Sequence, residues 1–171
     1  MANILNAKEI RREHDIHPLA QTFELPATMS ATYDASLAGD FRGGAFLTSI
    51  DLFFFEKDEI LPITVEIRTV ESGTPSPTVL PFSRVILNSE DVNTSDLGDV
   101  ETTFTFPAPV YIQEAEMYAL VIMCNSPEYK LFIARLGEPS LLGGKLLDKQ
   151  PLMGNLFKST NNRSWAMSPM E

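Results

Sequence analysis

The sequence predicts an all-β protein, a jelly-roll-like antiparallel β-sandwich of about eight strands, and three observations predict it. Short apolar runs rich in β-branched and aromatic residues recur from Ala45 onward at the close, regular spacing typical of sandwiches. Twelve prolines and nine glycines are spread along the 171 residues, which suits many short elements joined by turns. No convincing amphipathic helix follows the first 18 residues, and the length suits a single domain.

The chain opens with a polar N-terminal arm, residues 1–18, whose weak helical pattern ends at His17-Pro18 because a residue before proline disfavours the helical conformation. Residues 19–25 alternate between apolar and polar side chains and predict the first strand. A long loop rich in small and polar residues follows at 26–44. The β-sandwich is expected to occupy residues 19–137.

The next strands are predicted at 45–55 and 63–70, joined by the charged segment EKDEILP. The segment 71–82 holds three prolines, which predicts irregular or edge-like extended structure because proline cannot donate a ladder hydrogen bond. A strand at 83–88 and an acidic loop at 89–99 follow.

Three further strands are predicted at 100–106, 115–125 and 129–137. The last two are nearly continuous apolar runs separated by a short turn, a pattern that predicts a hairpin near the centre of a sheet. Residues 138–171 have paired apolar residues and glycine doublets, and we expect a closing hairpin and a C-terminal tail wrapped on the sandwich.

The strand at 45–55 carries three consecutive phenylalanines. Because strand side chains alternate, Ile50, Leu52 and Phe54 are expected in the core, while Phe53 and Phe55 point the other way. Leaving each of those two rings in water forfeits roughly 2 kcal/mol, so something should cover them. We expect the cover to be either the chain's own tail, Leu141 to Trp165, or a partner subunit.

The charge balance excludes some partners. Thirteen basic residues against 23 acidic ones give a net charge of −10, which disfavours nucleic acid and anionic membranes as partners. The sequence shows neither an apolar run near the roughly 20 residues of a spanning helix nor the apolar region of a signal peptide. A soluble protein made in a cytoplasm is expected.

Metal and cofactor sites are not expected. Cys124 is the single cysteine and lies in an apolar run, so an inert, buried thiol is favoured. His14 and His17 are three residues apart, but a metal would need at least a third ligand, and solvated side chains on the arm are favoured. Asp91, Asp96 and the residues near them resemble calcium ligands without matching the EF-hand pattern, so a solvated acidic loop is favoured.

The sequence also gives little support to catalysis. No G-x-S-x-G motif or phosphate-binding loop occurs, and both histidines lie on the arm. The acidic strand residues Asp51, Glu66 and Glu101 could in principle form a carboxylate pair. However, Glu66 and Arg68 share one face of their strand and are more simply a surface pair. We therefore expect a protein that is not an enzyme.

Glycan binding is the alternative that remains open. Sugar-binding modules stack sugars on exposed aromatic rings, preferably Trp and Tyr, whose rings have a polar edge. Tyr111 and Trp165 are the best candidates for such contacts. The other rings available are Tyr33, Phe53 and Phe55.

An ordered series of motifs adds a resemblance. PLAQTFEL, GAFLTSIDLFFFEKDEILPITVEIRTVESGTPSPTVLPFSRVIL, TTFTFPAPVYIQEAEMYALVIMCNSPEYKLFIARLGE and QPLMGNLFKSTNNRSW span residues 18–165. Together they resemble a β-sandwich module in structural proteins of tailed bacteriophages, particularly baseplate and tail-fibre proteins of contractile tails. The resemblance implies a virion protein, made in the host cytoplasm, that binds other virion proteins and copies of itself. It carries over no catalytic residues.

Overall fold

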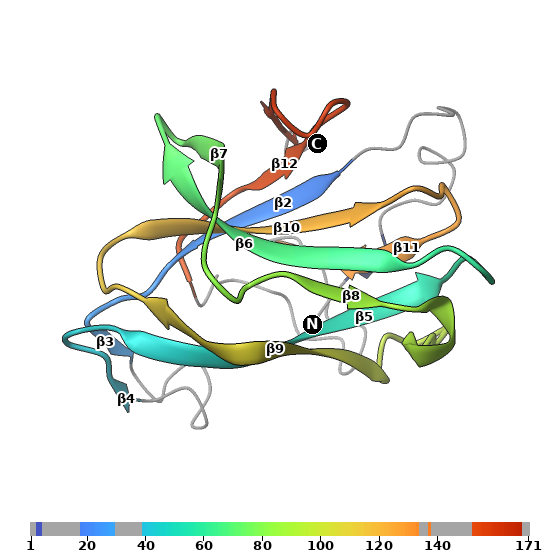
Figure 1. Ribbon diagram of the computed structural model, residues 1–171, viewed down its shortest axis with the longest axis horizontal. Helices are drawn as coiled ribbons and strands as arrows, with labels where there is room; N and C mark the ends of the chain where they lie inside the picture. Colours follow the sequence, from blue (N-terminus) through green and yellow to red (C-terminus); the bar gives the residue numbers. More distant parts are fainter. Residues whose placement is uncertain (1–2, 5–17, 30–38, 134–136, 138–151, 169–171) are drawn as a thin grey trace.

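The structure is a computed structural model and describes residues 3–4, 18–29, 39–133, 137 and 152–168. These residues form antiparallel β-sheets that pack against each other like a sandwich (Figure 1). The all-β prediction is therefore confirmed. In the described part of the chain, no helix is long and apolar enough to cross a membrane.

The larger sheet has seven strands and is strongly curled. Its order is β13-β12-β2-β10-β6-β7, and β8 pairs with β6 beside β7. The strands are β2 (Leu19–Glu24), β6 (Ile63–Glu71), β7 (Thr74–Val79), β8 (Val85–Leu87), β10 (Met117–Cys124), β12 (Leu156–Lys158) and β13 (Ala166–Met167).

The smaller sheet has four strands in the order β1-β11-β5-β9. They are β1 (Asn3–Ile4), β5 (Ala45–Glu56), β9 (Glu101–Ile112) and β11 (Lys130–Ile133). β3 (Thr28–Met29) pairs with β4 (Gly39–Asp40) in a separate two-stranded sheet. A short 3-10 helix, η1 (Ser89–Asp91), follows β8. Of the predicted arm, the description includes β1 and Pro18, and β1 extends the sheet beside β11.

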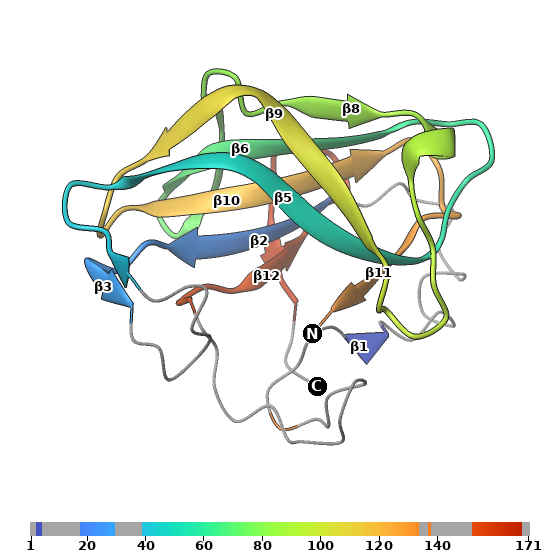
Figure 2. The same cartoon turned by 90° about the horizontal axis from the view of Figure 1, so that it is seen from below.

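The core lies where β5 and β9 cross the larger sheet (Figure 2). Phe54 packs its ring against Phe104 and Tyr129, with centroids 6.4 and 6.1 Å apart. Ile50 and Leu52 also pack on the core, as predicted. The larger sheet contributes alternate residues of β6, namely Ile63, Val65 and Ile67. The period-two pattern therefore assigned the inward faces of β5 and β6 correctly.

The predicted hairpin between the two apolar runs is wrong. β10 pairs with β2 and β6 in the larger sheet, whereas β11 pairs with β5 and β1 in the smaller one. The short link between them is held on the β5–β6 loop, where the Tyr129 hydroxyl donates to the Leu61 carbonyl and Ser126 donates to Asp58, both at 2.5 Å. Two buried strands look alike in sequence whether they are neighbours or lie in facing sheets.

Prolines mark two sheet edges. β7 ends the larger sheet with Pro75 and Pro77, as the sequence predicted for an edge-like segment, and β9 ends the smaller sheet with Pro107 and Pro109. A proline removes a backbone donor, so these edges resist the addition of another strand.

Candidate interaction surfaces

Phe53 and Phe55 lie on the outer face of β5, both half-buried. The Phe55 ring meets Phe132 of β11 edge-on, with centroids 6.0 Å apart, and the Lys130 amine lies 5.9 Å from the Phe55 centroid. Phe53 stands opposite Glu101 of β9. Part of the cover of Phe55 thus comes from β11, a source that the sequence did not suggest.

Trp165 packs on the outer face of the other sheet. There it meets a small apolar cluster of Ala20, Ala119, Val121 and Phe157. Its indole nitrogen is buried and has no hydrogen-bond partner among the described residues. This end of the predicted tail does not cover Phe53, and residues 141–151 lie outside the described residues, so cover of Phe53 by the tail or a partner stays a prediction.

Tyr111 stands opposite Phe46 on the outer face of the smaller sheet, and their rings are 5.4 Å apart. The Tyr111 hydroxyl donates to the Gly43 carbonyl at 2.8 Å. Gly44 has φ +92°, and a β-carbon there would lie 2.7 Å from the Tyr111 ring. The ring is therefore fixed against a turn that requires glycine, while Phe46 remains 67% exposed.

The two rings predicted as glycan contacts do not form one platform. Tyr111 belongs to the outer face of the smaller sheet, and Trp165 to that of the larger sheet. Each would have to bind a sugar separately. Whether either does so stays a prediction.

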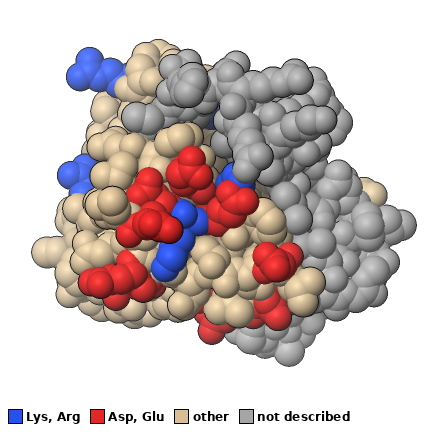
Figure 3. All heavy atoms as spheres, turned by 90° about the vertical axis from the view of Figure 1, so that its right-hand side faces the viewer, with Lys and Arg blue, Asp and Glu red and all other residues tan. Residues whose placement is uncertain are grey.

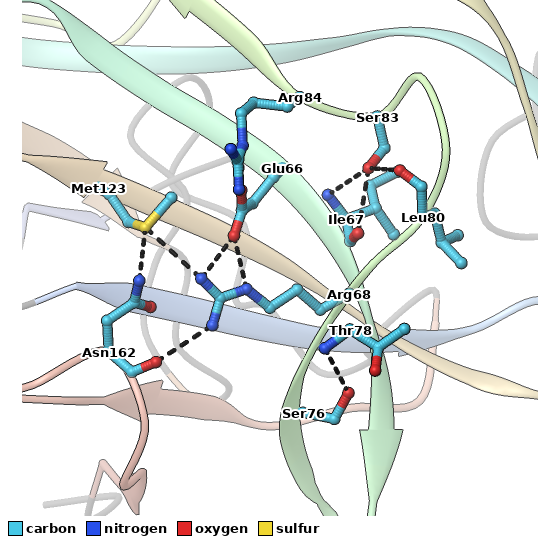
Figure 4. Close-up of polar contacts among 10 residues, drawn as sticks. All are labelled: Glu66, Ile67, Arg68, Ser76, Thr78, Leu80, Ser83, Arg84, Met123 and Asn162. Carbon is cyan, nitrogen blue, oxygen red and sulfur yellow. Dashed lines mark hydrogen bonds and ion pairs between the residues drawn. The ribbon is translucent and has the colours of Figure 1, made fainter.

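A buried ionic cluster lies beside the Trp165 region. Glu66 on β6 is 0% exposed and accepts from Arg68 Nε and Arg84 Nε, each at 2.6 Å (Figure 4). Arg68 is also buried, and its Nη1 donates to the Asn162 carbonyl at 3.2 Å. The prediction of a surface pair is therefore wrong, because the segment that carries Asn162 covers this face.

Arg84 has a different setting from Arg68. Its side chain is 57% exposed, and its hydrogen bond to Glu66 uses Nε. One carboxylate here faces two guanidinium groups, so the cluster carries one excess positive charge on a molecule with a net charge of −10. The terminal nitrogens of Arg84 thus suit a further carboxylate from outside.

The turn before Arg84 has an unusual backbone. The Ser83 amide donates to the Leu80 carbonyl at 3.3 Å, with Pro81 at the second position and Phe82 at φ +63° in the third. Such a turn favours glycine at its third position, and a bulky residue there costs about 1 kcal/mol or more. Phe82 is also 63% exposed, so neither burial nor backbone preference explains the phenylalanine.

Ser83 holds this turn on the sheet. Its buried hydroxyl accepts from the Ile67 amide at 3.1 Å and lies within hydrogen-bond distance of the Leu80 and Ile67 carbonyls, at 2.8 and 3.1 Å (Figure 4). The Leu80 amide donates in turn to the Ile67 carbonyl at 2.8 Å. The backbone that carries Phe82 is therefore fixed to β6 by hydrogen bonds.

Exposed side chains recur at every second position from this turn, through β8 and into η1. We name this row the β8 stripe; it consists of Phe82, Arg84, Ile86, Asn88 and Glu90. The residues between them point inward: Ser83 and Ser89 are buried, and Val85 and Leu87 pack on the core. Alternation within 83–88 identifies the outward Arg84 and Ile86, whereas Phe82 lay in the segment predicted as irregular.

Acidic side chains gather at one end of the molecule (Figure 3). The predicted acidic loop contains η1, and Lys57 ties it down by donating to the Ser89 and Val92 carbonyls, both at 2.7 Å. Asp99 accepts a hydrogen bond from Ser95. Across the described residues, no group of three His, Cys, Asp or Glu side chains is placed to hold a metal ion.

The remaining candidate groups show no reactive arrangement in the described chain. Burial raises the pKa of the Cys124 thiol, which donates to the Ser126 carbonyl at 3.1 Å. A thiol of this kind is a poor nucleophile because the thiolate is disfavoured. His14 and His17 lie outside the described residues.

Two features of the surface therefore stand out: the Phe46–Tyr111 pair and the β8 stripe. Both place large side chains in solvent on a rigid support. The pair lies on the other sheet from the C-terminal segment, whereas the stripe borders the cover of that segment through the bond of Arg84 to Glu66. Comparison of the chain with known protein families, with curated proteins and with solved structures found no match.

Proposed function

We propose that this chain is a non-catalytic structural protein of a tailed-bacteriophage virion, in the baseplate or tail-fibre region. It assembles by contacts with other virion proteins and with copies of itself. The placement in a phage tail rests on the ordered motifs of residues 18–165. In this proposal the sandwich is jelly-roll-like, an architecture found in viral capsid domains.

The observation that carries the binding role is the exposed pair of Phe46 and Tyr111. Their rings contact each other in solvent, and the turn at Gly44 holds Tyr111 in place. Aromatic side chains on a fixed backbone lose little conformational entropy when a partner covers them. Because prolines hinder strand addition at the β7 and β9 edges, a contact through this face is favoured over strand addition at those two edges.

Glycan binding at Tyr111 is the second candidate. The ring lies beside polar groups that could bind sugar hydroxyls: Arg42 is held by Asp40, and Glu114 accepts from the Gly43 amide at 2.6 Å. Host-surface sugars are commonly recognised by an exposed aromatic ring, on which the sugar stacks, and by charged neighbours, which bind the sugar hydroxyls. Against it, Phe46 lacks the polar edge of Tyr or Trp.

The test of the proposed function is the location of the chain in purified virions. Antibodies against the chain should label the end of the tail in electron micrographs, and mass spectrometry should find the chain in washed particles. Its absence from intact particles would contradict the proposal. A glycan array distinguishes the alternative: binding to a defined sugar that is lost in Tyr111→Ala, and kept in Trp165→Phe, would favour recognition of a host sugar.

A further inference from the structure

We propose that the β8 stripe joins two copies of this chain about a two-fold axis, with Arg84 of each copy facing Glu90 of the other. This dimer rests on the proposed function, because self-association is one way in which an assembly module works. The residues that support it are those of the β8 stripe, and the Phe46–Tyr111 pair is not involved.

The first observation is the backbone of Phe82. The turn imposes a positive φ that favours glycine, yet the position carries an aromatic ring that is left 63% exposed. Strained backbone conformations cluster at functional sites such as ligand clamps and switch regions. Docking of the Phe82 ring against a second copy accounts for a strained, exposed phenylalanine that the isolated fold does not explain.

The second observation is the orientation of Arg84. Buried Glu66 holds its Nε edge at 2.6 Å, so the guanidinium is positioned before binding and less side-chain entropy is lost on association. The opposite edge of the guanidinium can bind a second carboxylate through two parallel hydrogen bonds. The partner at this position should therefore present Asp or Glu.

The third observation is that the stripe complements itself. Arg84 lies toward one end, Glu90 lies at the other, and Ile86, which is exposed, stands between them. A two-fold rotation reverses the order of the residues, so Arg84 meets Glu90 of the second copy twice across one interface, and each Phe82 lies at an outer end of that interface, just beyond Glu90 of the second copy. At about 3.3 Å per residue, Arg84 and Glu90 are at most roughly 20 Å apart, a span suited to a small interface.

Sedimentation equilibrium over a range of concentrations tests the proposal. The wild-type chain should form dimers, and Phe82→Gly should weaken the association at least tenfold. The same variant should unfold at an equal or higher urea concentration, because glycine relieves the positive φ. Loss of dimer with an intact fold is the signature of a binding role.

Charge reversal gives the second measurement. Glu90→Arg should weaken the dimer at least tenfold, because it places two arginines opposite each other, whereas Glu59→Arg, an exposed acid outside the stripe, should leave it unchanged. Phe46→Ser, which removes an exposed ring of the other sheet, should also leave the dimer unchanged.

A chain that stays monomeric at millimolar concentration, or a dimer that neither Phe82→Gly nor Glu90→Arg weakens, would overturn the inference. These outcomes are distinct from failure of the proposed function. A monomer that antibodies locate at the tail end refutes the stripe dimer alone, and a stripe dimer that is absent from virions refutes the placement in the tail alone.

Discussion

The outer faces of the two sheets differ in what covers them. On the larger sheet, the C-terminal segment places Trp165 over an apolar cluster and sets Asn162 against Arg68, so that Glu66 is out of contact with water, while the β8 stripe near the edge of that sheet stays exposed. On the smaller sheet, Phe46 and Tyr111 remain in solvent, and Asp51 is exposed. Both faces follow the same alternation along their strands.

The difference shows that alternation assigns a side chain to a face and does not say whether that face is covered. Asp51 accepts a hydrogen bond from Thr103 at 2.6 Å and is otherwise exposed. Glu66, in the same kind of position, needs two arginines because a buried carboxylate without counter-charges is very costly. Substitutions on the two faces should therefore differ in their cost.

The largest expected effect is that of Glu66→Ala. It leaves buried Arg68 without its carboxylate, and breaking a buried pair in this way costs about 3–5 kcal/mol. The free energy of unfolding in urea measures this loss. Asp51→Ala on the exposed face is the matched control and should cost less than about 1 kcal/mol. Equal losses would mean that cover is not what distinguishes the faces.

A smaller loss is expected for Trp165→Ala. Removing a fully buried aromatic ring lowers the free energy of unfolding by about 3–5 kcal/mol. Because Trp165 is half-buried, its removal should lower the free energy of unfolding by about 2 kcal/mol. Trp165→Phe should stay close to the wild type, since it keeps a ring and removes an indole N–H that has no partner in the described chain.

Tyr111→Ala provides the comparison on the exposed face. The ring contacts Phe46 and the Gly44 turn but leaves much of its surface in water, so its removal should cost less than removal of Trp165. Urea unfolding again gives the values. If Tyr111→Ala proves the costlier of the two, the smaller sheet depends on its exposed ring for stability and the contrast between the faces is lost.

The all-β class and most strand positions could be predicted from the sequence because alternation is a local signal. The strands expected at 45–55 and 63–70 correspond to β5 and β6 within one residue at each end. The neighbours of β11 could not be predicted in this way. Its apolar residues satisfy either sheet, and the choice depends on Tyr129 and Ser126 binding a distant loop.

The surfaces were less predictable for the same reason. The spacing of Glu66 and Arg68 correctly indicated that the two side chains share a face and pair. Their burial depends on Arg84 and Asn162, which are 18 and 94 residues away along the chain. The sequence contains no indication of the exposed, strained position of Phe82. Pro81 predicts a turn, but a phenylalanine does not indicate a positive φ.

The smallest expected effect concerns an exposed ion pair near the uncovered face. The Arg42 guanidinium donates to the Asp40 carboxylate, and the Arg42 backbone amide donates to Asp40 Oδ1 at 3.1 Å. These bonds lower the pKa of Asp40 below its ordinary value of 3.8. Because the folded-state pKa is the lower one, the pair favours the fold above pH 3.8, and this contribution is lost as the pH falls through the folded-state pKa.

Titration of Asp40 by NMR checks this directly. Arg42→Gln should raise the pKa of Asp40 toward 3.8, and about 1 M salt should raise it in part, because exposed charges are screened. The same salt should leave the stability loss of Glu66→Ala almost unchanged, since ions do not reach a buried pair. If salt reduces that loss as strongly as it shifts Asp40, then water and ions reach Glu66, and the C-terminal segment does not seal the larger sheet in solution.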